Sequence, residues 1–340
     1  MQLFIVPFIL AGIISFVSTP LIRKLAFKIG AVDIPKDNRR VHKKPMPLIG
    51  GLAIAIGVFI GMLIFTPIDT TTIYIVLGGT VILIAGIIDD IRELSPRYKM
   101  LFQLLAGIIL IIGGVKVDFI TNPFAQGSGI IYLNWLSIPI TLFWVVGITN
   151  TLNFIDGLDG LSAGVAMISS LSLMIVAARF GQSTVVILAA LVAGACLGFL
   201  PFNFNPAKIF MGDTGAMFLG FMLAAISIEG VMKSVAAIAV IAPIIILGVP
   251  IFDTTFAIFR RLLNGQSVST ADKGHLHHRL LNRGFSQKKA VLILYAMSAL
   301  FGIFAVLISR ADSKQAIYLA GAMLVITAVF AVRLGFFEKR

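Results

Sequence analysis

The sequence has little charge for its length and almost no cysteine. Only 12% of its 340 residues are Asp, Glu, Lys or Arg, about half the share found in soluble domains. A single cysteine, Cys196, lies in the apolar run "VVILAALVAGACLGFL", which excludes a disulfide framework. By contrast, 59% of the residues are hydrophobic and the mean hydropathy is +1.03. We therefore expect an all-α, polytopic membrane helical bundle.

Eleven apolar segments, each near the ~20 residues that cross a bilayer, follow one another along the chain. The fifth and eighth are short, so ten spans are the alternative, and Pro243 and Pro250 interrupt the ninth. Residues 116–134 predict an extracytoplasmic excursion with a small hairpin. We expect 1–340 to form one membrane domain. The segments are 2–22, 48–66, 72–88, 100–115, 135–149, 161–178, 184–201, 214–229, 234–259, 290–308 and 315–334.

Lysine and arginine are unevenly distributed among the connections. One set of connections and the C-terminal segment together hold 22 of the 27 Lys and Arg residues. By the positive-inside rule this side is cytoplasmic, with the N-terminus outside and the C-terminus inside. The net charge of +12 then reflects topology and affinity for anions, and nucleic-acid binding is not expected. The cytoplasmic connections are 23–47, 89–99, 150–160, 202–213 and 260–289.

The first polar motif, "GIIDDIRELSPRYKM" at 86–100, places Asp89 and Asp90 at the end of the third apolar segment. A helix C-terminus carries partial negative charge, so two adjacent carboxylates there attract a cation. That cation is a basic side chain of the same loop or, as the functional alternative, a bound Mg²⁺ or a proton to be removed, and the motif alone leaves these open. The basic side chains within reach are Arg92, Arg97 and Lys99.

The second motif, "NTLNFIDGLDG" at 150–160, carries Asn150, Asn153, Asp156 and Asp159 at a stride of three. On an α-helix each such step turns back by about 60°, so Asn150 and Asn153 are neighbours while Asp159 faces away. The glycines let the helix break, which brings the aspartates back toward one pocket. Oxygen-only side chains suit Mg²⁺, for which Mn²⁺ can substitute. A polar loop with amide caps is the alternative.

The third motif, "FNFNPAKIFMGDTGAMF" at 202–218, sets Asp213 at the start of the eighth apolar segment. Asp213 is expected to cap that helix, to bind a metal beside its N-terminus, or both. The flanking glycines also leave backbone N–H groups open to a phosphate. Phe210 is a candidate for stacking on a nucleobase.

The longest polar stretch, 259–289, contains seven Lys or Arg residues and three of the four histidines. Zinc is disfavoured there, because no cysteine and no H-E-x-x-H pattern accompany the histidines. Phosphate binding is the better interpretation, and a solvated basic loop is the alternative. Asp253 lies seven residues before Arg260 on one helix face and predicts either an ion pair or a substrate contact. The histidines are His275, His277 and His278.

A basic cluster precedes the second apolar segment, within "DIPKDNRRVHKKPMPLIGG" at 33–51. It contains Arg39, His42 and Lys43. One interpretation is an orientation signal attracted to anionic lipid. The other is a cradle for the phosphate of a lipid substrate.

The motifs "KPMPLIGG", "GIIDD", "NTLNFIDGLDG", "AKIFMGDTG" and "GHLHHRL" together resemble those of the bacterial polyprenyl-phosphate N-acetylhexosamine-1-phosphate transferases, glycosyltransferase family 4. The resemblance covers nearly the whole chain. It is strongest to the branch that transfers GlcNAc-1-phosphate from UDP-GlcNAc to undecaprenyl phosphate and so initiates teichoic acid linkage units, enterobacterial common antigen and some O-antigens. The sister branch, which transfers phospho-MurNAc-pentapeptide, has a triple-histidine run, whereas Leu276 interrupts it here.

The resemblance implies a bacterial cytoplasmic membrane enzyme, is compatible with a homodimer, and suggests a role for each matching residue. The catalytic residues are Asp89 and Asp90, with Asp156 as a further candidate. The metal ligands are Asn153 and Asp213. The residues for UDP-GlcNAc are Asn150, Asp159, Lys208, Phe210, His275, His277, His278 and Arg279, with Phe210 packed on uracil. The residues for the lipid phosphate are Arg39, His42 and Lys43.

The implied reaction is Mg²⁺-dependent phosphoryl transfer, in which the lipid phosphate attacks the β-phosphorus of UDP-GlcNAc and UMP leaves. Asp89 is the expected proton acceptor and Asp90 the residue that orients it. A covalent sugar-phosphate on Asp156 or Asp89 is the alternative. A transporter or flippase for an anionic substrate is the competing class. It is disfavoured because the acids and amides gather on one face instead of at the midplane.

Overall fold

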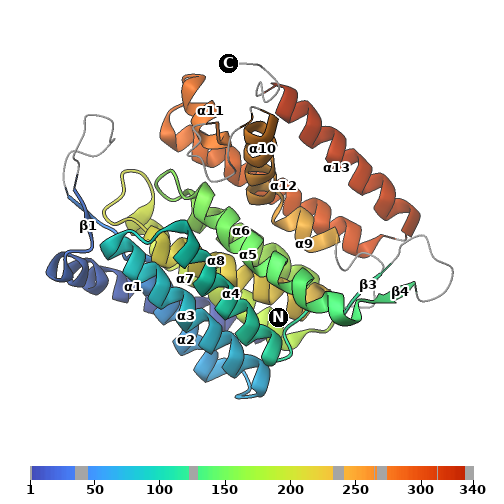
Figure 1. Ribbon diagram of the computed structural model, residues 1–340, viewed down its shortest axis with the longest axis horizontal. Helices are drawn as coiled ribbons and strands as arrows, with labels where there is room; N and C mark the ends of the chain where they lie inside the picture. Colours follow the sequence, from blue (N-terminus) through green and yellow to red (C-terminus); the bar gives the residue numbers. More distant parts are fainter. Residues whose placement is uncertain are drawn as a thin grey trace.

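The computed structural model of the protein describes residues 2–34, 45–121, 129–232, 241–263, 265, 274–311 and 313–333. The described chain is almost entirely helical, with two short pairs of antiparallel strands (Figure 1). The residues predicted to hold the lipid phosphate, Arg39, His42 and Lys43, lie outside the described ranges.

The helices follow the chain in three groups. The first is α1 (Gln2–Ile29), α2 (Gly51–Phe65), α3 (Thr70–Arg92) and α4 (Pro96–Ile112). The second is α5 (Ser137–Ile155), α6 (Leu161–Arg179), α7 (Ser183–Asn203) and α8 (Gly212–Ile226), which continues as the π-helix Ser227–Met232. The third is α9 (Ile241–Ile246), α10 (Gly248–Leu263), α11 (Leu276–Asn282), α12 (Gln287–Arg310) and α13 (Ser313–Arg333).

The strands are very short. Strand β1 (Val32–Asp33) pairs with β2 (Met46–Pro47), and β3 (Phe119–Thr121) pairs with β4 (Ile130–Tyr132). The second pair falls within 116–134 and confirms the small hairpin predicted there. A 3₁₀ turn, Asn134–Leu136, leads from it into α5.

Each of the eleven predicted apolar segments coincides with a helix, and the ninth is divided between α9 and α10. Among the described residues, seven helices are long and apolar enough to cross a bilayer, namely α1, α3, α5, α6, α7, α8 and α12. Helix α2 and the segment Gln315–Phe330 of α13 are shorter apolar helices. The chain is therefore a multi-pass membrane protein built of helices, as predicted from its composition.

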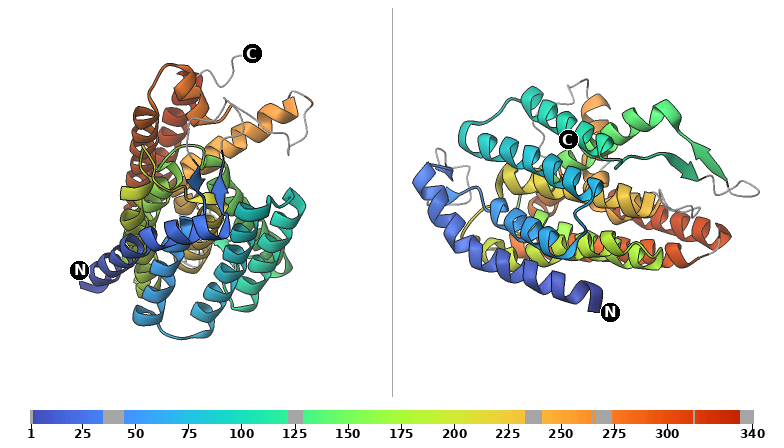
Figure 2. Two further views of the ribbon diagram at one scale, coloured as in Figure 1. Left: turned by 90° about the vertical axis from the view of Figure 1, so that its left-hand side faces the viewer. Right: turned by 90° about the horizontal axis from the view of Figure 1, so that it is seen from below.

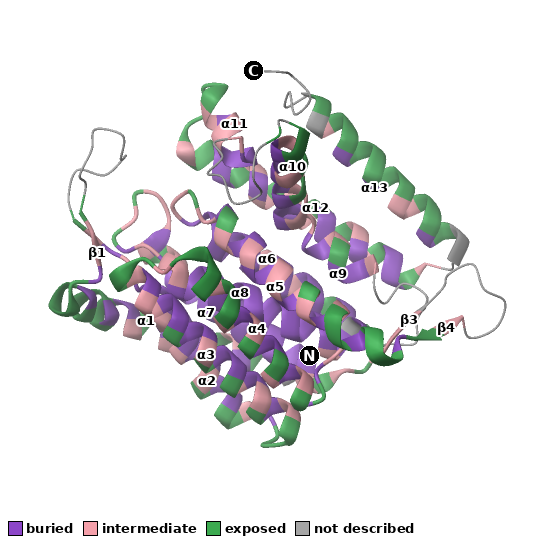
Figure 3. Cartoon of the chain, in the orientation of Figure 1, coloured by how far each residue is buried: buried purple, intermediate pink, exposed green. Residues whose placement is uncertain are grey.

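Helices α7 and α8 form the buried centre of the bundle, whereas α1 and α13 expose much of their surface (Figure 3). Small residues bring α1 and α7 close together. A Cβ at Gly194 or Gly198 would lie 2.0 Å from the carbonyl oxygen of Phe8 or Gly12, respectively. Such positions let helix backbones pack in contact where lipid offers little drive for association.

The polar connections gather at one end of the bundle, which we call the polar end. It consists of β1 and β2, the α3–α4, α5–α6 and α7–α8 connections, and α11, at the upper left in Figure 1. The start of α1 and strands β3 and β4 lie toward the opposite end (Figures 1 and 2). The fold therefore places all the described polar motifs on one side.

Candidate active site

The N-terminus of α8 is capped by a carboxylate from another helix. Asp90, in the last turn of α3, accepts hydrogen bonds from the backbone N–H groups of Asp213 and Thr214 at 2.9 and 3.0 Å. The Thr214 hydroxyl donates to the same carboxylate at 2.6 Å. The first N–H groups of a helix lack partners within it, and a helix N-terminus favours negative charge. Asp90 therefore fixes α8 against α3.

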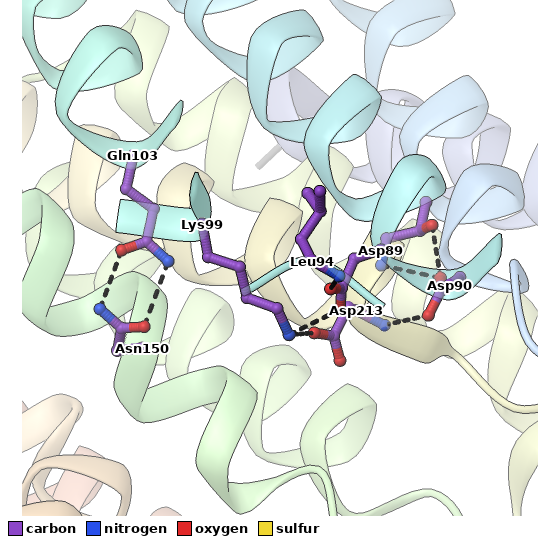
Figure 4. A network of polar contacts seen from close by, with 8 residues as sticks. Asp89, Asp90, Leu94, Lys99, Gln103, Asn150 and Asp213 are labelled. Atoms are coloured by element: carbon purple, nitrogen blue, oxygen red, sulfur yellow. Dashed lines mark hydrogen bonds and ion pairs between the residues drawn. The ribbon is translucent and has the colours of Figure 1, made fainter. Parts of the chain in front are cut away.

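This arrangement corrects two expectations. Asp213 does not cap α8, because it lies in the first turn and Asp90 supplies the cap. The sequence also predicts that Asp90 orients Asp89, whereas the Asp90 carboxylate is turned to α8 (Figure 4). The local sequence identifies a helix start, but it does not reveal that a carboxylate from α3 reaches the same N–H groups.

Glycines let α2 and α3 approach α8 closely enough for this contact. A Cβ at Gly86 of α3 would lie 2.4 Å from Thr214 Cα, and one at Gly51 of α2 would lie 2.0 Å from Gly215 Cα. Gly212 has φ +70°, a conformation that favours glycine. Backbone packing therefore sets the position of the first turn of α8.

Lys99, in the first turn of α4, joins the acids of α3 and α8 (Figure 4). Its ammonium nitrogen lies 2.6 Å from Asp89 Oδ2 and forms a second close ion pair with Asp213 Oδ2. The other Asp89 oxygen accepts a hydrogen bond from Leu94 N at 2.6 Å. The Asp89 side chain is 8% exposed, whereas those of Lys99 and Asp213 are 25% and 27% exposed. We call these two ion pairs, Lys99 with Asp89 and Lys99 with Asp213, the Lys99 bridge. The bridge lies at the edge of the packed core and is partly open to solvent.

Asn153 and Asp156 approach the bridge from the end of α5. The Asn153 side-chain amide lies near enough to Asp213 to favour the ionised form of that carboxylate. Helix α5 ends at Ile155 and Asp156 follows as its C-cap, which confirms the predicted break. Burial raises the pKa of the Asp156 carboxyl well above its usual value, and the charges of Asp213 and Asp90 raise it further. A cation added beside these acids would favour the ionised form of Asp156.

Asn150 lies one turn before Asn153 and pairs with Gln103 of α4. Their side-chain amides exchange two hydrogen bonds, of 2.9 and 3.1 Å (Figure 4). Asn150 Nδ2 also donates to Val146 O at 2.9 Å. The pair ties α4 to α5 beside the Lys99 bridge. The assignment of Asn150 to UDP-GlcNAc stays a prediction.

Asp159 and Asn203 tie the α5–α6 connection to the α7–α8 connection. Asp159 Oδ2 accepts hydrogen bonds from Asn205 Nδ2 at 2.9 Å and from Ala207 N at 3.1 Å. Asn203 Oδ1 accepts a third from Gly160 N at 3.1 Å. Two polar motifs that are separated in sequence by helices α6 and α7 thus lie side by side and form one surface.

Phe210 and Lys208 lie on the α7–α8 connection. Phe210 N donates to Pro47 O at 2.8 Å, and Phe210 O accepts from Gly50 N at 3.0 Å. The motifs "KPMPLIGG" and "AKIFMGDTG" are therefore joined through their backbones. Phe210 is half-buried and Lys208 is exposed, and their predicted contacts with the nucleotide sugar stay predictions.

Asp253 of α10 anchors the start of α11. Its Oδ2 lies 2.8 Å from His275 Nδ1, and its Oδ1 accepts a hydrogen bond from Leu276 N at 2.6 Å. The Asp253 side chain is 1% exposed. Because an ionised carboxylate only accepts, His275 Nδ1 carries the proton and Nε2 is the nitrogen left for a ligand. The sequence associates Asp253 with Arg260 or a substrate, and the structure adds this link to the histidines.

His277 is buried against the second motif. A Cβ on Gly157 would lie 2.3 Å from His277 Nε2, so the imidazole packs on the glycine backbone. His277 Nδ1 has no hydrogen-bond partner among the described residues. Burial, and to a smaller extent the neighbouring His278, lowers the pKa of His277 from 6.5 to about 4. The ring is therefore neutral at pH 7 and offers hydrogen bonds in place of a positive charge.

Two arginines supply cationic groups at the start of α11. Arg279 Nε and Arg260 Nη1 both donate to Gly274 O, at 3.0 and 3.1 Å. The His275 ring lies beside these groups and stacks nearly parallel to His277, with ring centroids 5.8 Å apart. The structure therefore brings three of the predicted donor-binding residues into one patch.

The donor atoms at the Lys99 bridge suit a hard divalent cation. Asp89 and Asp213 offer carboxylate oxygens and Asn153 an amide oxygen, and an ammonium group already lies between the two acids. Among the described residues, no group of three or more His, Cys, Asp or Glu could hold a metal. Mg²⁺ binds proteins through one or two carboxylates, waters and substrate phosphates, and its binding here stays a prediction.

Several contacts at the polar end are not evident from the sequence. The sequence offers Lys99 only as one of three alternative counter-ions and gives no signal for Gln103. Asn203 and Asn205 lie within a motif that assigns them no role. Only the spacing of Lys99 from the acid pair gave a signal, because the others act between connections that are distant in sequence.

Comparison with known proteins gives consistent matches over the chain. The sequence model of glycosyl transferase family 4 matches residues 72–231. A probable undecaprenyl-phosphate N-acetylglucosaminyl 1-phosphate transferase of Bacillus subtilis is 42% identical over 339 residues, covering 99% of this chain and 93% of that protein. A decaprenyl-phosphate N-acetylglucosaminephosphotransferase of Mycolicibacterium smegmatis is 35% identical, covering 94% and 85%. The Escherichia coli undecaprenyl-phosphate alpha-N-acetylglucosaminyl 1-phosphate transferase is 28% identical, covering 84% and 78%.

Proposed function

Because the chain belongs to glycosyltransferase family 4, we propose that it transfers GlcNAc-1-phosphate from UDP-GlcNAc to undecaprenyl phosphate. The products are UMP and a lipid-diphosphate-GlcNAc that initiates a cell-wall or surface polysaccharide. The names of the Bacillus subtilis and Escherichia coli relatives support the donor and the acceptor. The observation that carries the proposal is the gathering of Asp89, Asp213 and Asn153 around one cation position at the polar end.

The reaction exchanges one phosphoanhydride bond for another. An oxygen of the lipid phosphate forms a bond to the β-phosphorus, and the bond from that phosphorus to the bridging oxygen of UMP breaks. A phosphate monoester is already largely ionised near pH 7, since its second pKa is about 6. The chain therefore needs to position two anions and offset their charge more than it needs a strong base.

The residues of the polar end can divide these tasks. Asp89 faces the bridge through one oxygen while its other oxygen is held by Leu94 N, so its position is fixed by the turn that ends α3. Asp213 is held by the first turn of α8. Asp90 acts as a positioning residue, because all its described contacts are with α8.

We propose that the enzyme depends on Mg²⁺ held by Asp213, Asn153 and Asp89. Bound there, the ion would neutralise charge on the diphosphate. The oxygen-rich donor set and the ammonium between the two acids support this assignment.

The start of α11 is proposed to bind the phosphates and sugar of the donor. Arg279 brings a planar guanidinium suited to phosphate. His277 supplies a neutral ring with an unpartnered buried nitrogen, which favours a ligand hydroxyl or phosphate oxygen as partner. We also propose that the polar end faces the cytoplasm of a bacterium, as the distribution of Lys and Arg predicts.

The test is a reaction with purified components. Detergent-solubilised protein is incubated with undecaprenyl phosphate, Mg²⁺ and UDP-GlcNAc, and UMP and the lipid product are quantified. UDP-GalNAc and UDP-MurNAc-pentapeptide are compared as donors. Highest UMP release with UDP-GlcNAc supports the proposal, and preference for the pentapeptide donor moves the protein to the sister branch.

Two controls separate chemistry from transport. Asp213→Asn should abolish UMP release while the protein still elutes as a folded species. Proteoliposomes loaded with nucleotide sugar should show no counterflow in the absence of UMP release. Counterflow without UMP would instead identify a carrier.

A further inference from the structure

The Lys99 ammonium occupies the position between Asp89 and Asp213 where the proposed function needs a metal. It lies 2.6 Å from Asp89 Oδ2 and forms a close ion pair with Asp213 Oδ2. The Asn153 side-chain amide lies beside the same Asp213 carboxylate. A divalent ion ligated by both carboxylates would need the space and the oxygen lone pairs that the ammonium uses.

We infer that Lys99 is an exchangeable counter-ion, so that Mg²⁺ enters the site only by displacing the Lys99 ammonium from Asp89 and Asp213. This inference rests on the proposed function for its metal, but it concerns a property of the chain without substrate. Lys99 would offset part of the negative charge of the two acids while the site is empty of donor. It would also weaken metal binding until a diphosphate supplies further ligands.

The geometry makes exchange feasible. Lys99 is a quarter exposed and sits in the first turn of α4, on a side chain with four rotatable carbons. Asp89 and Asp213 are fixed by backbone contacts, through Leu94 N and through the capped turn of α8. The acids therefore stay in place when the ammonium leaves, and the cation is the part that moves.

Arg97 provides a matched control. It lies two residues before Lys99 in the same turn and is exposed, and among the described contacts it forms no ion pair with Asp89 or Asp213. Replacement of either residue by methionine removes one positive charge near the acids. A general electrostatic effect would appear in both variants, whereas exchange is specific to Lys99.

The experiment measures Mn²⁺ binding to the detergent-solubilised protein without substrates, by electron paramagnetic resonance. Lys99→Met should bind Mn²⁺ with a Kd at least about tenfold lower than the wild type, because an ammonium at contact distance no longer competes. Arg97→Met should change the Kd less than about threefold. A Lys99→Met Kd equal to that of Arg97→Met, or higher than that of the wild type, would overturn the inference.

A second measurement uses the wild-type chain and so does not depend on the folding of a variant. Reductive methylation followed by mass spectrometry reports how accessible each lysine is. Saturating Mn²⁺ should increase methylation of Lys99 several-fold, while Lys116, which pairs with Asp118 at 3.0 Å away from the polar end, should be unaffected. Equal protection of Lys99 with and without Mn²⁺ would contradict exchange. Both results are independent of UMP release, so the failure of the proposed function and that of the exchange are distinguishable.

Discussion

The polar end contains two groups of side chains that are held in different ways. The acidic group, Asp89, Asp90 and Asp213, is fixed by backbone N–H groups and by helices that touch at glycines. The histidine group, His275 and His277 on α11, is attached by the buried carboxylate of Asp253 and by the packing of His277 on a glycine. One group is part of the helix packing, and the other is docked onto it.

This difference in attachment predicts which residues can be changed without loss of the fold. Removal of Asp89 or Asp90 leaves backbone N–H groups without their acceptor, and removal of Asp213 takes one of two carboxylates from Lys99. A contact of the histidine group can be removed while the bundle keeps its core. Substitutions in the acidic group should therefore reduce stability and activity together, whereas those in the histidine group should reduce activity alone.

The largest effect is expected for Asp90→Ala, which tests whether the acidic group belongs to the fold. Two backbone N–H groups and one hydroxyl lose their acceptor, which should cost roughly 2–5 kcal/mol of stability. Displacement of Asp213 should also lower the rate of UMP release at least about 10²-fold. Thermal unfolding and UMP release measured on the same preparation check both effects.

Asp69→Ala is the control for that substitution. Asp69 caps α3, accepting a hydrogen bond from Thr72 N at 2.8 Å, and lies away from the polar end. Its loss should cost about 1 kcal/mol and leave UMP release unchanged. An Asp90→Ala protein as stable as Asp69→Ala would show that the acidic group is not needed for the fold. The proposed difference between the acidic group and the histidine group would then be wrong.

Asp253→Asn tests the histidine group, with a smaller expected effect. Asparagine can still accept from Leu276 N, but its amide donates to His275 Nδ1, which reverses the tautomer of the ring. We expect kcat to fall about 10- to 100-fold with the thermal midpoint nearly unchanged. A fall in kcat accompanied by equal loss of stability would assign Asp253 to the core instead.

The sequence predicts features that lie within one segment, but it does not predict the contacts between helices. The apolar segments revealed the helices, and the ninth was resolved into two only by the structure. The motifs correctly located Asp89, Asn153 and Asp213 at one end. The role of Asp90 as a cap, the Lys99 bridge and the Asp253–His275 pair could not be derived, because each joins two helices whose relative rotation a single sequence does not specify. The basic cluster with Arg39, His42 and Lys43 lies outside the described residues.

Gly157→Ala should have a milder effect than Asp253→Asn. It tests the histidine group through the contact between Gly157 and the His277 ring. The added Cβ would lie 2.3 Å from His277 Nε2, and His277 is buried, so the ring has to move. UMP release should fall by about tenfold or less, with little change in stability. Gly147→Ala is the control, since a Cβ there meets nothing within 4 Å. Equal activity of the two variants would mean that the position of His277 does not matter for turnover.

The smallest expected effect is a pH dependence of stability that originates in the histidine group. The pKa of His277 is about 4 in the folded protein and 6.5 as the ordinary value. Between those values the unfolded chain binds a proton that the folded chain does not, so stability falls as pH decreases from about 6.5 to about 4.

Replacement of His277 by glutamine, which keeps a polar side chain but does not titrate, isolates this contribution from His275, His278 and Asp253, which face it. The thermal midpoint of the wild type should drop by roughly 2–5 °C more than that of His277→Gln across this pH window. Parallel curves for the two proteins would mean that His277 is already solvated. The histidine group would then be a loosely attached surface instead of a docked part of the site.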